Sequence, residues 1–174
     1  MKKYLCALLA LLGGCATAPK GLVPVGGFEL PRYLGTWHEV ARLDHSFERG
    51  LVNVTAEYSM RGDGGVKVVN RGYKTATGEW KEAVGRAYFT GAPTVGQLKV
   101  SFFRPFYGGY NIVELDREGY TYALVVGPST KYLWILARKP ELEPAIVERL
   151  KARARELGYN TDKLIFPGAA PQAK

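Results

Sequence analysis

The chain has 174 residues, of which 47% are hydrophobic, and it carries a formal net charge of +8 with only two cysteines. This length fits one domain with a single core, and so few cysteines exclude a disulfide-stabilised scaffold. The basic residues are scattered along the chain, which argues against a nucleic-acid partner and leaves either attraction to anionic lipid head groups or an ordinary solvated surface.

The N-terminus has the pattern of an export signal. Two lysines follow Met1, an apolar run extends to Leu12, and small residues precede Cys15 in the stretch LGGC. The apolar run is too short to span a bilayer, and LGGC resembles the lipobox of bacterial lipoproteins. We therefore expect a signal peptide over residues 1–14 and lipidation of the Cys15 sulfur. The alternative is an ordinary secretory signal with an incidental cysteine.

A segment rich in proline and glycine follows the signal and has no periodicity. We expect residues 15–30 to form the lipidated N-terminus and a flexible tether. Ala16, directly after the cysteine, indicates sorting to the outer membrane. The expected location is therefore the outer membrane, lipid-anchored and facing the periplasm, with the membrane as a partner through the anchor.

Eight strand candidates lie in the predicted domain, residues 31–166, and turn-forming sequences such as RGDGG and DREG separate them. The short connections predict antiparallel neighbours without crossover helices. The strands are expected at roughly Thr36–Leu43, Leu51–Met60, Val66–Lys74, Trp80–Phe89, Gln97–Phe103, Tyr110–Asp116, Tyr120–Gly127 and Tyr132–Arg138.

The sequence near the C-terminus predicts one helix. In the stretch PELEPAIVERLKARARELG, apolar residues recur near one helical face, acidic residues come first, basic residues come last, and Gly158 can end the helix. The stretch Lys163–Phe166 predicts a short ninth strand. Residues 167–174 are expected to be a disordered tail.

Alternation of apolar and polar residues assigns the inner face of each strand. Gly85, Ala87 and Ala123 are small residues on inner faces, where a solid core would need larger groups. Eight antiparallel strands can form a sandwich or close into a barrel, and closure removes both edges. An eight-stranded barrel is about wide enough either to be filled by side chains or to hold one small ligand. The small residues favour a cavity. The alternative is a barrel filled by the aromatic side chains of Tyr58, Phe89, Phe102 and Trp134.

Several motifs together resemble the lipocalin family, and bacterial outer-membrane lipoprotein lipocalins in particular. They are LGTWHEVAR at the first strand, YALVVGPSTKYLWILAR at Tyr122–Arg138, AYFTGAP and KVSFFRPFYGGYN. The resemblance implies an all-β, eight-stranded antiparallel up-and-down barrel with one C-terminal helix packed outside. It also implies a structural closed end at which Gly35 allows close backbone approach and Arg138 packs across the ring of Trp37. His38, where relatives often have tyrosine, departs from the family pattern.

The resemblance further implies a protein that stores or transports fatty acids, lysophospholipids or similar amphiphiles in the bacterial envelope, with no cofactor, no metal and no catalysis. An acyl chain is expected to enter the barrel tail first. The residues expected to contact it are Val54, Ala56, Tyr58, Val68, Ala87, Val100, Phe102, Ala123, Val125, Trp134 and Leu136.

Two other functions stay open at this stage. One is a lipid-modifying enzyme on the same scaffold, for which Asp44 and His45 could act as an acid and a base; the pair His38 and His45 matches no common metal-ligand spacing. The other is an interaction lipoprotein that docks a protein, or a second copy in a homodimer, through the aromatic stretch Arg104–Tyr110. The sequence does not fix which lipid is preferred.

Overall fold

The computed structural model describes residue 19 and residues 21–168. The predicted signal peptide, the lipidation site Cys15 and residues 169–174 of the tail lie outside the described residues. No helix of the described part is long and apolar enough to cross a membrane.

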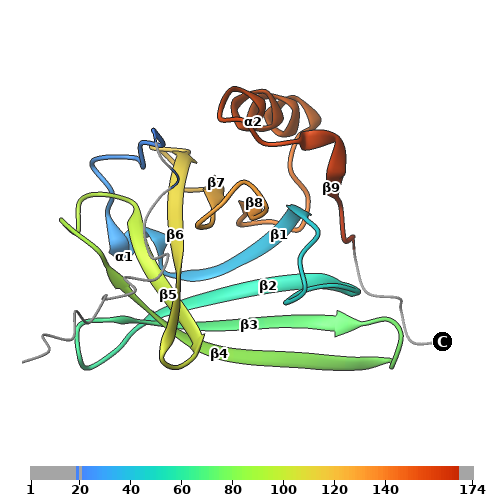
Figure 1. The fold of residues 1–174 in the computed structure, drawn as a ribbon, viewed down its shortest axis with the longest axis horizontal. Helices are drawn as coiled ribbons and strands as arrows, with labels where there is room; N and C mark the ends of the chain where they lie inside the picture. Colours follow the sequence, from blue (N-terminus) through green and yellow to red (C-terminus); the bar gives the residue numbers. More distant parts are fainter. Residues whose placement is uncertain (1–18, 20, 169–174) are drawn as a thin grey trace, which may run out of the picture.

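The described chain forms one antiparallel barrel with a helix on its outer surface (Figure 1). Its elements, in chain order, are α1 (Leu30–Tyr33), β1 (Gly35–Leu43), β2 (Leu51–Met60), β3 (Val66–Lys74), β4 (Glu79–Phe89), β5 (Gln97–Phe103), β6 (Phe106–Leu115), β7 (Tyr122–Val126), β8 (Leu133–Ala137), α2 (Pro144–Glu156), η1 (Thr161–Lys163) and β9 (Leu164–Ile165).

The barrel closes because β1 pairs with both β2 and β8. From β2 to β8 each strand pairs with the next one in sequence, and β9 adds to β1 outside the closed ring. Closure satisfies the backbone groups that two open sheet edges would leave unpaired. The predicted fold, with eight barrel strands, an outer helix and a short ninth strand, is confirmed.

The prediction that the tether extends to residue 30 is wrong for its last six residues. The backbone N–H of Val25 donates to the carbonyl oxygen of Ile112 at 2.8 Å, and that of Phe28 donates to Thr94 at 2.8 Å. Phe28 is only 2% exposed and belongs to the core inside the barrel. The composition of the segment is that of a linker, but its apolar residues at Val25 and Phe28 find partners that only the closed barrel supplies.

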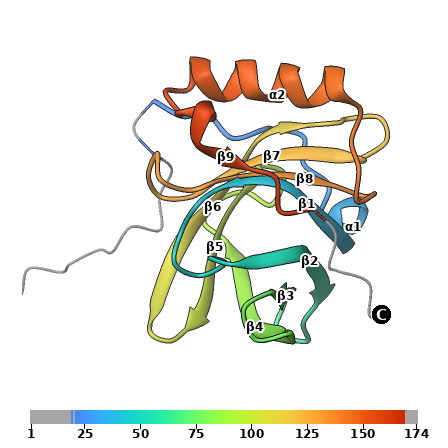
Figure 2. The same cartoon turned by 90° about the vertical axis from the view of Figure 1, so that its right-hand side faces the viewer.

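Two hydrophobic cores lie on opposite faces of the same strands. One lies inside the barrel, and the other lies between α2 and the outer faces of β1, β7 and β8. Figure 2 shows α2 lying across one side of the barrel, with β2, β3 and β4 on the opposite side. Leu150 and Ala154 of α2 are fully buried in the outer core.

A leucine-to-alanine substitution in the outer core should therefore destabilise the fold. We expect Leu150→Ala to lower the free energy of unfolding by about 2–5 kcal/mol, because it leaves a cavity that the rigid sheet cannot fill. Urea unfolding followed by circular dichroism measures the change. Ala substitution of Glu156, an exposed residue of the same helix, should change it by less than about 0.5 kcal/mol. Equal effects of the two substitutions would contradict the packing described here.

Candidate functional site

One end of the barrel is closed by the ring of Trp37 near the start of β1. The side chain is fully buried, and its Nε1 donates to the carbonyl oxygen of Tyr33 at 2.8 Å. The ring centroids of Tyr33 and Trp37 are 4.6 Å apart. These contacts fix α1, which ends at Tyr33, beneath the first strand.

Arg138 stacks on the ring of Trp37. Its guanidinium carbon lies 4.1 Å from the centre of the Trp37 ring. The guanidinium donates to the carbonyl oxygens of Thr36 at 2.9 Å, Arg32 at 2.7 Å and Tyr120 at 3.2 Å. Because arginine has five donors in a planar fork, it can join three chain segments while its flat face stacks on the indole.

Gly35 fits this place because of its backbone conformation. Its φ is +91°, a conformation that residues other than glycine rarely adopt. A Cβ added there would lie in contact with Nη1 of Arg138, at 3.4 Å. Glycine at position 35 therefore lets the chain turn into β1 directly beneath the guanidinium.

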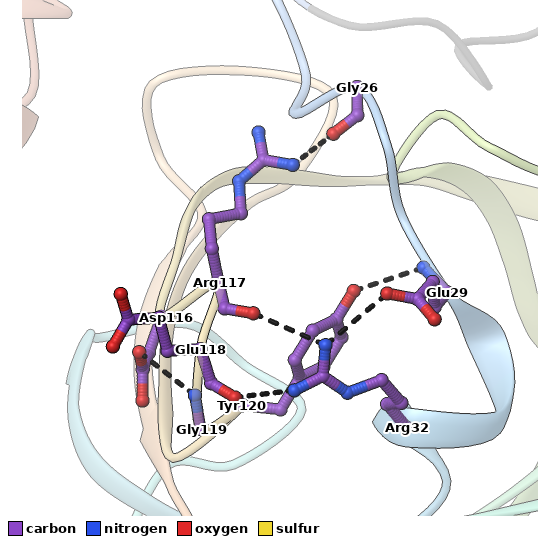
Figure 3. A network of polar contacts seen from close by, with 8 residues as sticks. All are labelled: Gly26, Glu29, Arg32, Asp116, Arg117, Glu118, Gly119 and Tyr120. Atoms are coloured by element: carbon purple, nitrogen blue, oxygen red, sulfur yellow. Dashed lines mark hydrogen bonds and ion pairs between the residues drawn. The ribbon is translucent and has the colours of Figure 1, made fainter.

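A second polar network surrounds the closed end (Figure 3). The guanidinium of Arg32 lies 4.2 Å from the centre of the Tyr120 ring and donates to the backbone carbonyls of Arg117 and Glu118. The Tyr120 hydroxyl accepts a hydrogen bond from the backbone N–H of Glu29 at 3.0 Å. Arg117 in turn donates to the carbonyl oxygen of Gly26. The segment before β1 and the β6–β7 turn are thus held together.

A hollow of about 770 Å³, part of it open to solvent, lies inside the barrel on the inner side of the closed end. Most of its walls are apolar. The lining residues are Phe28, Leu30, Tyr33, Glu39, Glu48, Val54, Ala56, Tyr58, Val66, Val68, Asn70, Ala87, Leu98, Val100, Phe102, Tyr110, Trp134 and Leu136.

Nine of the eleven residues predicted to contact an acyl chain line this hollow, and Ala123 and Val125 do not. Both are fully buried in the core inside the barrel, where that core is packed solid. Alternation therefore assigned their face correctly, but it does not say where along the barrel the core ends and the hollow begins.

Val66 and Leu98 also line the hollow, and they lie at inward-facing positions of the alternating strands β3 and β5. The wall residues contributed by the segment before β1 are Phe28, Leu30 and Tyr33. They carried no such signal, because they belong to no barrel strand. Phe102 lines the hollow but is 42% exposed, because it also reaches the outer surface.

Three tyrosine hydroxyls meet at the wall of the hollow. The Tyr110 hydroxyl lies 2.7 Å from that of Tyr33 and 2.8 Å from that of Tyr58, so the three form a hydrogen-bonded chain. Burial raises the pKa of each hydroxyl above its usual value, which keeps all three neutral. The three hydroxyls therefore satisfy one another within an otherwise apolar wall.

Another part of the wall holds a buried charged cluster. A register shift between Glu39 and Ala41 of β1 changes the alternation, so that both Glu39 and Arg42 are buried together. Arg42 bonds to the Glu39 carboxylate and donates to the carbonyl oxygens of Glu48 at 2.8 Å and Leu51 at 3.1 Å. It therefore ties the β1–β2 loop to the barrel.

The Glu48 carboxylate completes this cluster. It accepts a hydrogen bond from Nε1 of Trp134 at 2.9 Å, and Nε2 of His45 lies 3.0 Å away, in a close pair without the geometry of a well-directed hydrogen bond. His45 is only 6% exposed and does not line the hollow. Asp44 pairs with Arg49 rather than with His45. The acid–base pair considered from the sequence is therefore not assembled.

The two carboxyl groups have opposite pKa shifts. Burial and the neighbouring Glu48 charge raise the pKa of Glu39, and Arg42 only partly counteracts this. Burial alone would raise the pKa of Glu48, but its close contacts with His45 and Trp134 outweigh burial and lower the pKa.

Within residues 21–168 the structure holds no group of three or more His, Cys, Asp or Glu side chains that could hold a metal ion. His38 lies on β1, partly buried, and its partner residues across the sheet are Thr55 and Ala137.

The closed end, the hollow and the apolar walls together define a barrel built to hold a small apolar ligand. Residues 28–169 match the family model of the lipocalin-like domain. The chain therefore belongs to the lipocalin family, as its motifs predicted.

Close relatives are bacterial lipoproteins. The chain is 56% identical over 163 residues to the outer membrane lipoprotein Blc of Vibrio cholerae, covering 94% of this chain and 95% of the relative. It is 51% identical over 160 residues to the outer membrane lipoprotein Blc of Escherichia coli K12, covering 92% and 90%. Insecticyanin from the tobacco hornworm Manduca sexta shares the fold, with a TM-score of 0.69 at 22% identity over 90% of this chain and 88% of that one.

Replacing Arg138 should loosen the closed end. We expect Arg138→Met to lower the free energy of unfolding by about 2–4 kcal/mol, because three backbone carbonyls lose their donor and the indole loses its cation. Arg138→Lys keeps the charge but not the planar fork, so its effect should be intermediate. Urea unfolding measures both, and faster hydrogen exchange at Tyr33–Trp37 locates the change. A Lys variant as stable as the wild type would contradict the bonding described.

The Glu39 carboxyl should make stability depend on pH. Its pKa in the folded state is raised, so the folded protein keeps a proton that the unfolded chain loses at about pH 4.5, and stability falls as pH rises above that value. Glu39→Gln keeps an acceptor for Arg42 and removes this proton. From pH 5 to pH 8 the wild type should lose more than about 1 kcal/mol of unfolding free energy relative to the variant.

Urea unfolding at several pH values tests this dependence. Glu57→Gln, an exposed substitution on β2, is the control and should show the same pH dependence as the wild type. A constant difference between wild type and Glu39→Gln across this range would mean that Glu39 is ionised in the folded protein.

Proposed function

We propose that this protein binds fatty acids, lysophospholipids or similar amphiphiles in the hollow, and stores or carries them at the outer membrane, to which Cys15 anchors it. The observation that supports this most is the hollow itself, which is closed at the Trp37 end and lined mainly by apolar side chains. An acyl chain is the ligand that such a narrow apolar space suits best.

The energy of such binding is sufficient. Each buried methylene contributes about 0.8 kcal/mol, so a sixteen-carbon chain could gain about 12 kcal/mol before the costs of immobilisation. With several kcal/mol lost to those costs, micromolar or tighter affinity is within reach. The small side chains of Ala56 and Ala87 on the wall provide the width that the chain needs.

The relatives support the location and the type of function. Both bacterial relatives described above are named outer membrane lipoproteins, and this chain matches them over more than nine-tenths of its length. Lipocalins typically bind ligands rather than catalyse reactions. The burial of His45 against Glu48, away from the hollow, adds nothing in favour of an enzyme.

Filling the hollow should abolish lipid binding. The experiment uses the chain from residue 15 with Cys15→Ser, and titrates it with a fluorescent fatty acid. We expect Ala87→Phe and Ala56→Phe each to weaken binding at least tenfold, because the added ring occupies the space of the acyl chain. Two positions are tested because either substitution could disturb packing, which circular dichroism and thermal unfolding detect.

The matched control is Ala152→Phe, which adds the same ring to an exposed position of α2 on the outside of the barrel. Its affinity should stay within twofold of the wild type. A folded wild-type protein without saturable binding, and without lipid in an organic extract analysed by mass spectrometry, would refute the proposed function.

A further inference from the structure

A second pocket lies on the outer surface of the barrel wall at β4 and β5. Figure 1 shows β4 on the side of the barrel away from α2. The pocket encloses about 330 Å³, part of it open to solvent, and differs from the interior hollow in being mainly polar. Its lining residues are Arg61, Val84, Gly85, Arg86, Ser101, Phe102 and Arg104. Three guanidinium groups thus surround one small depression.

Strand register places the centre of this pocket. Arg86 of β4 lies directly opposite Ser101 of β5, so their side chains share the outer face of the sheet. On the other side of Arg86, its partner across the sheet is Lys67 of β3. Lys67, Arg86 and Ser101 therefore lie in one row on the outer face. Ala87 and Val100, the next residue pair, line the hollow inside instead.

The Ser101 hydroxyl contributes no hydrogen bond to the fold of the described residues. Ser101 is only 4% exposed, yet its Oγ has no hydrogen-bond partner within the described part of the chain. An unpaired buried hydroxyl is unfavourable, and such groups are usually satisfied by protein, water or a ligand. Because Ser101 lines the pocket, a ligand atom placed there could accept its hydrogen bond.

Two of the three guanidinium groups keep their charge available. Arg61 is held by Asp63, with Nε 3.0 Å from Oδ1 and Nη2 2.8 Å from Oδ2. Among residues 21–168 no ion pair or hydrogen bond joins Arg86 or Arg104 to a carboxylate. The pocket therefore presents two uncompensated positive charges beside an unsatisfied hydroxyl donor.

We infer that this outer pocket binds a phosphate group, with Arg86 and Arg104 balancing its charge and Ser101 donating a hydrogen bond to one of its oxygens. A phosphate monoester carries about −1.5 to −2 charges and three acceptor oxygens, which matches two arginines and a hydroxyl that approach from different strands. A carboxylate, with one charge and two oxygens, would leave one of these groups unmatched.

Phe102 connects this pocket with the interior. Its side chain lines both the hollow and the outer pocket. The pairing of β4 with β5 ends at Arg86 and Ser101. Beyond this pair, the Phe102 ring closes the wall in place of paired backbone. A Cβ on Gly85 would come within 2.8 Å of this ring. The phosphate could thus belong to a lipid whose tail lies in the hollow, which rests on the proposed function, or to a free phosphate.

The first experiment tests the pocket with inorganic phosphate alone. Phosphate is added to the ¹⁵N-labelled chain from residue 15 with Cys15→Ser, at constant ionic strength set by sodium chloride. We expect saturable shifts of the Arg86 and Ser101 amide resonances, at least tenfold weaker binding in Arg86→Gln/Arg104→Gln, and weaker binding in Ser101→Ala. The control Arg149→Gln/Arg153→Gln removes the same charge from α2 and should bind as the wild type does.

The second experiment identifies the source of the phosphate. Binding of a lysophosphatidylethanolamine is compared with that of the monoacylglycerol with the same acyl chain, which lacks the phosphate. If the lipid supplies the phosphate, Arg86→Gln/Arg104→Gln should weaken lysophospholipid binding about tenfold and monoacylglycerol binding less than twofold. Equal losses for both lipids would overturn the lipid source.

The outcomes separate this inference from the proposed function. Phosphate-dependent shifts in a protein that binds neither lipid would support the pocket and refute the proposed function. Phosphate shifts that the double variant abolishes, without any change in lipid binding, would assign the pocket to free phosphate. Shifts that sodium chloride reproduces, or that the double variant leaves unchanged, together with unchanged lipid binding, would overturn the inference.

Discussion

The contact between Arg138 and Trp37 is the constraint on which the rest of the structure depends. One guanidinium stacks on the indole and bonds to carbonyl oxygens from α1, β1 and the β6–β7 turn. It therefore joins segments that are far apart in sequence at a point where a barrel would otherwise be open. Because this end is closed, the hollow is open only at the opposite end of the barrel, and a ligand would enter there.

The opposite part of the interior uses charge for a similar purpose. Arg42, Glu39 and Glu48 are buried together, and Arg42 bonds to backbone carbonyls of the β1–β2 loop. Burying such a cluster is costly unless its members are paired. Here the pairing fixes a loop at the open end of the barrel, so the hollow is bounded by apolar packing at one end and by a polar network near the other.

The strands β4 and β5 carry two different chemistries on their two faces. Ala87 and Val100 face an apolar hollow, while their neighbours Arg86 and Ser101 face a basic outer pocket. This requires no change in the backbone, because successive side chains of a strand point to opposite faces of the sheet. Phe102 belongs to both faces because the regular pairing ends beside it, which makes this part of the wall the link between inside and outside.

Alternation, turn sequences and the late amphipathic helix by themselves determined the eight strands, the antiparallel pairing of consecutive strands and the outer helix, because these features depend on local periodicity. The same alternation identified nine wall residues of the hollow. Only the tertiary structure decided the rest. The register shift that buries Arg42 beside Glu39, the docking of Phe28 under the barrel and the meeting of Arg86 with Arg104 depend on which strands come together. No local pattern carries that information, because those partners are separated in sequence and meet only when the barrel closes.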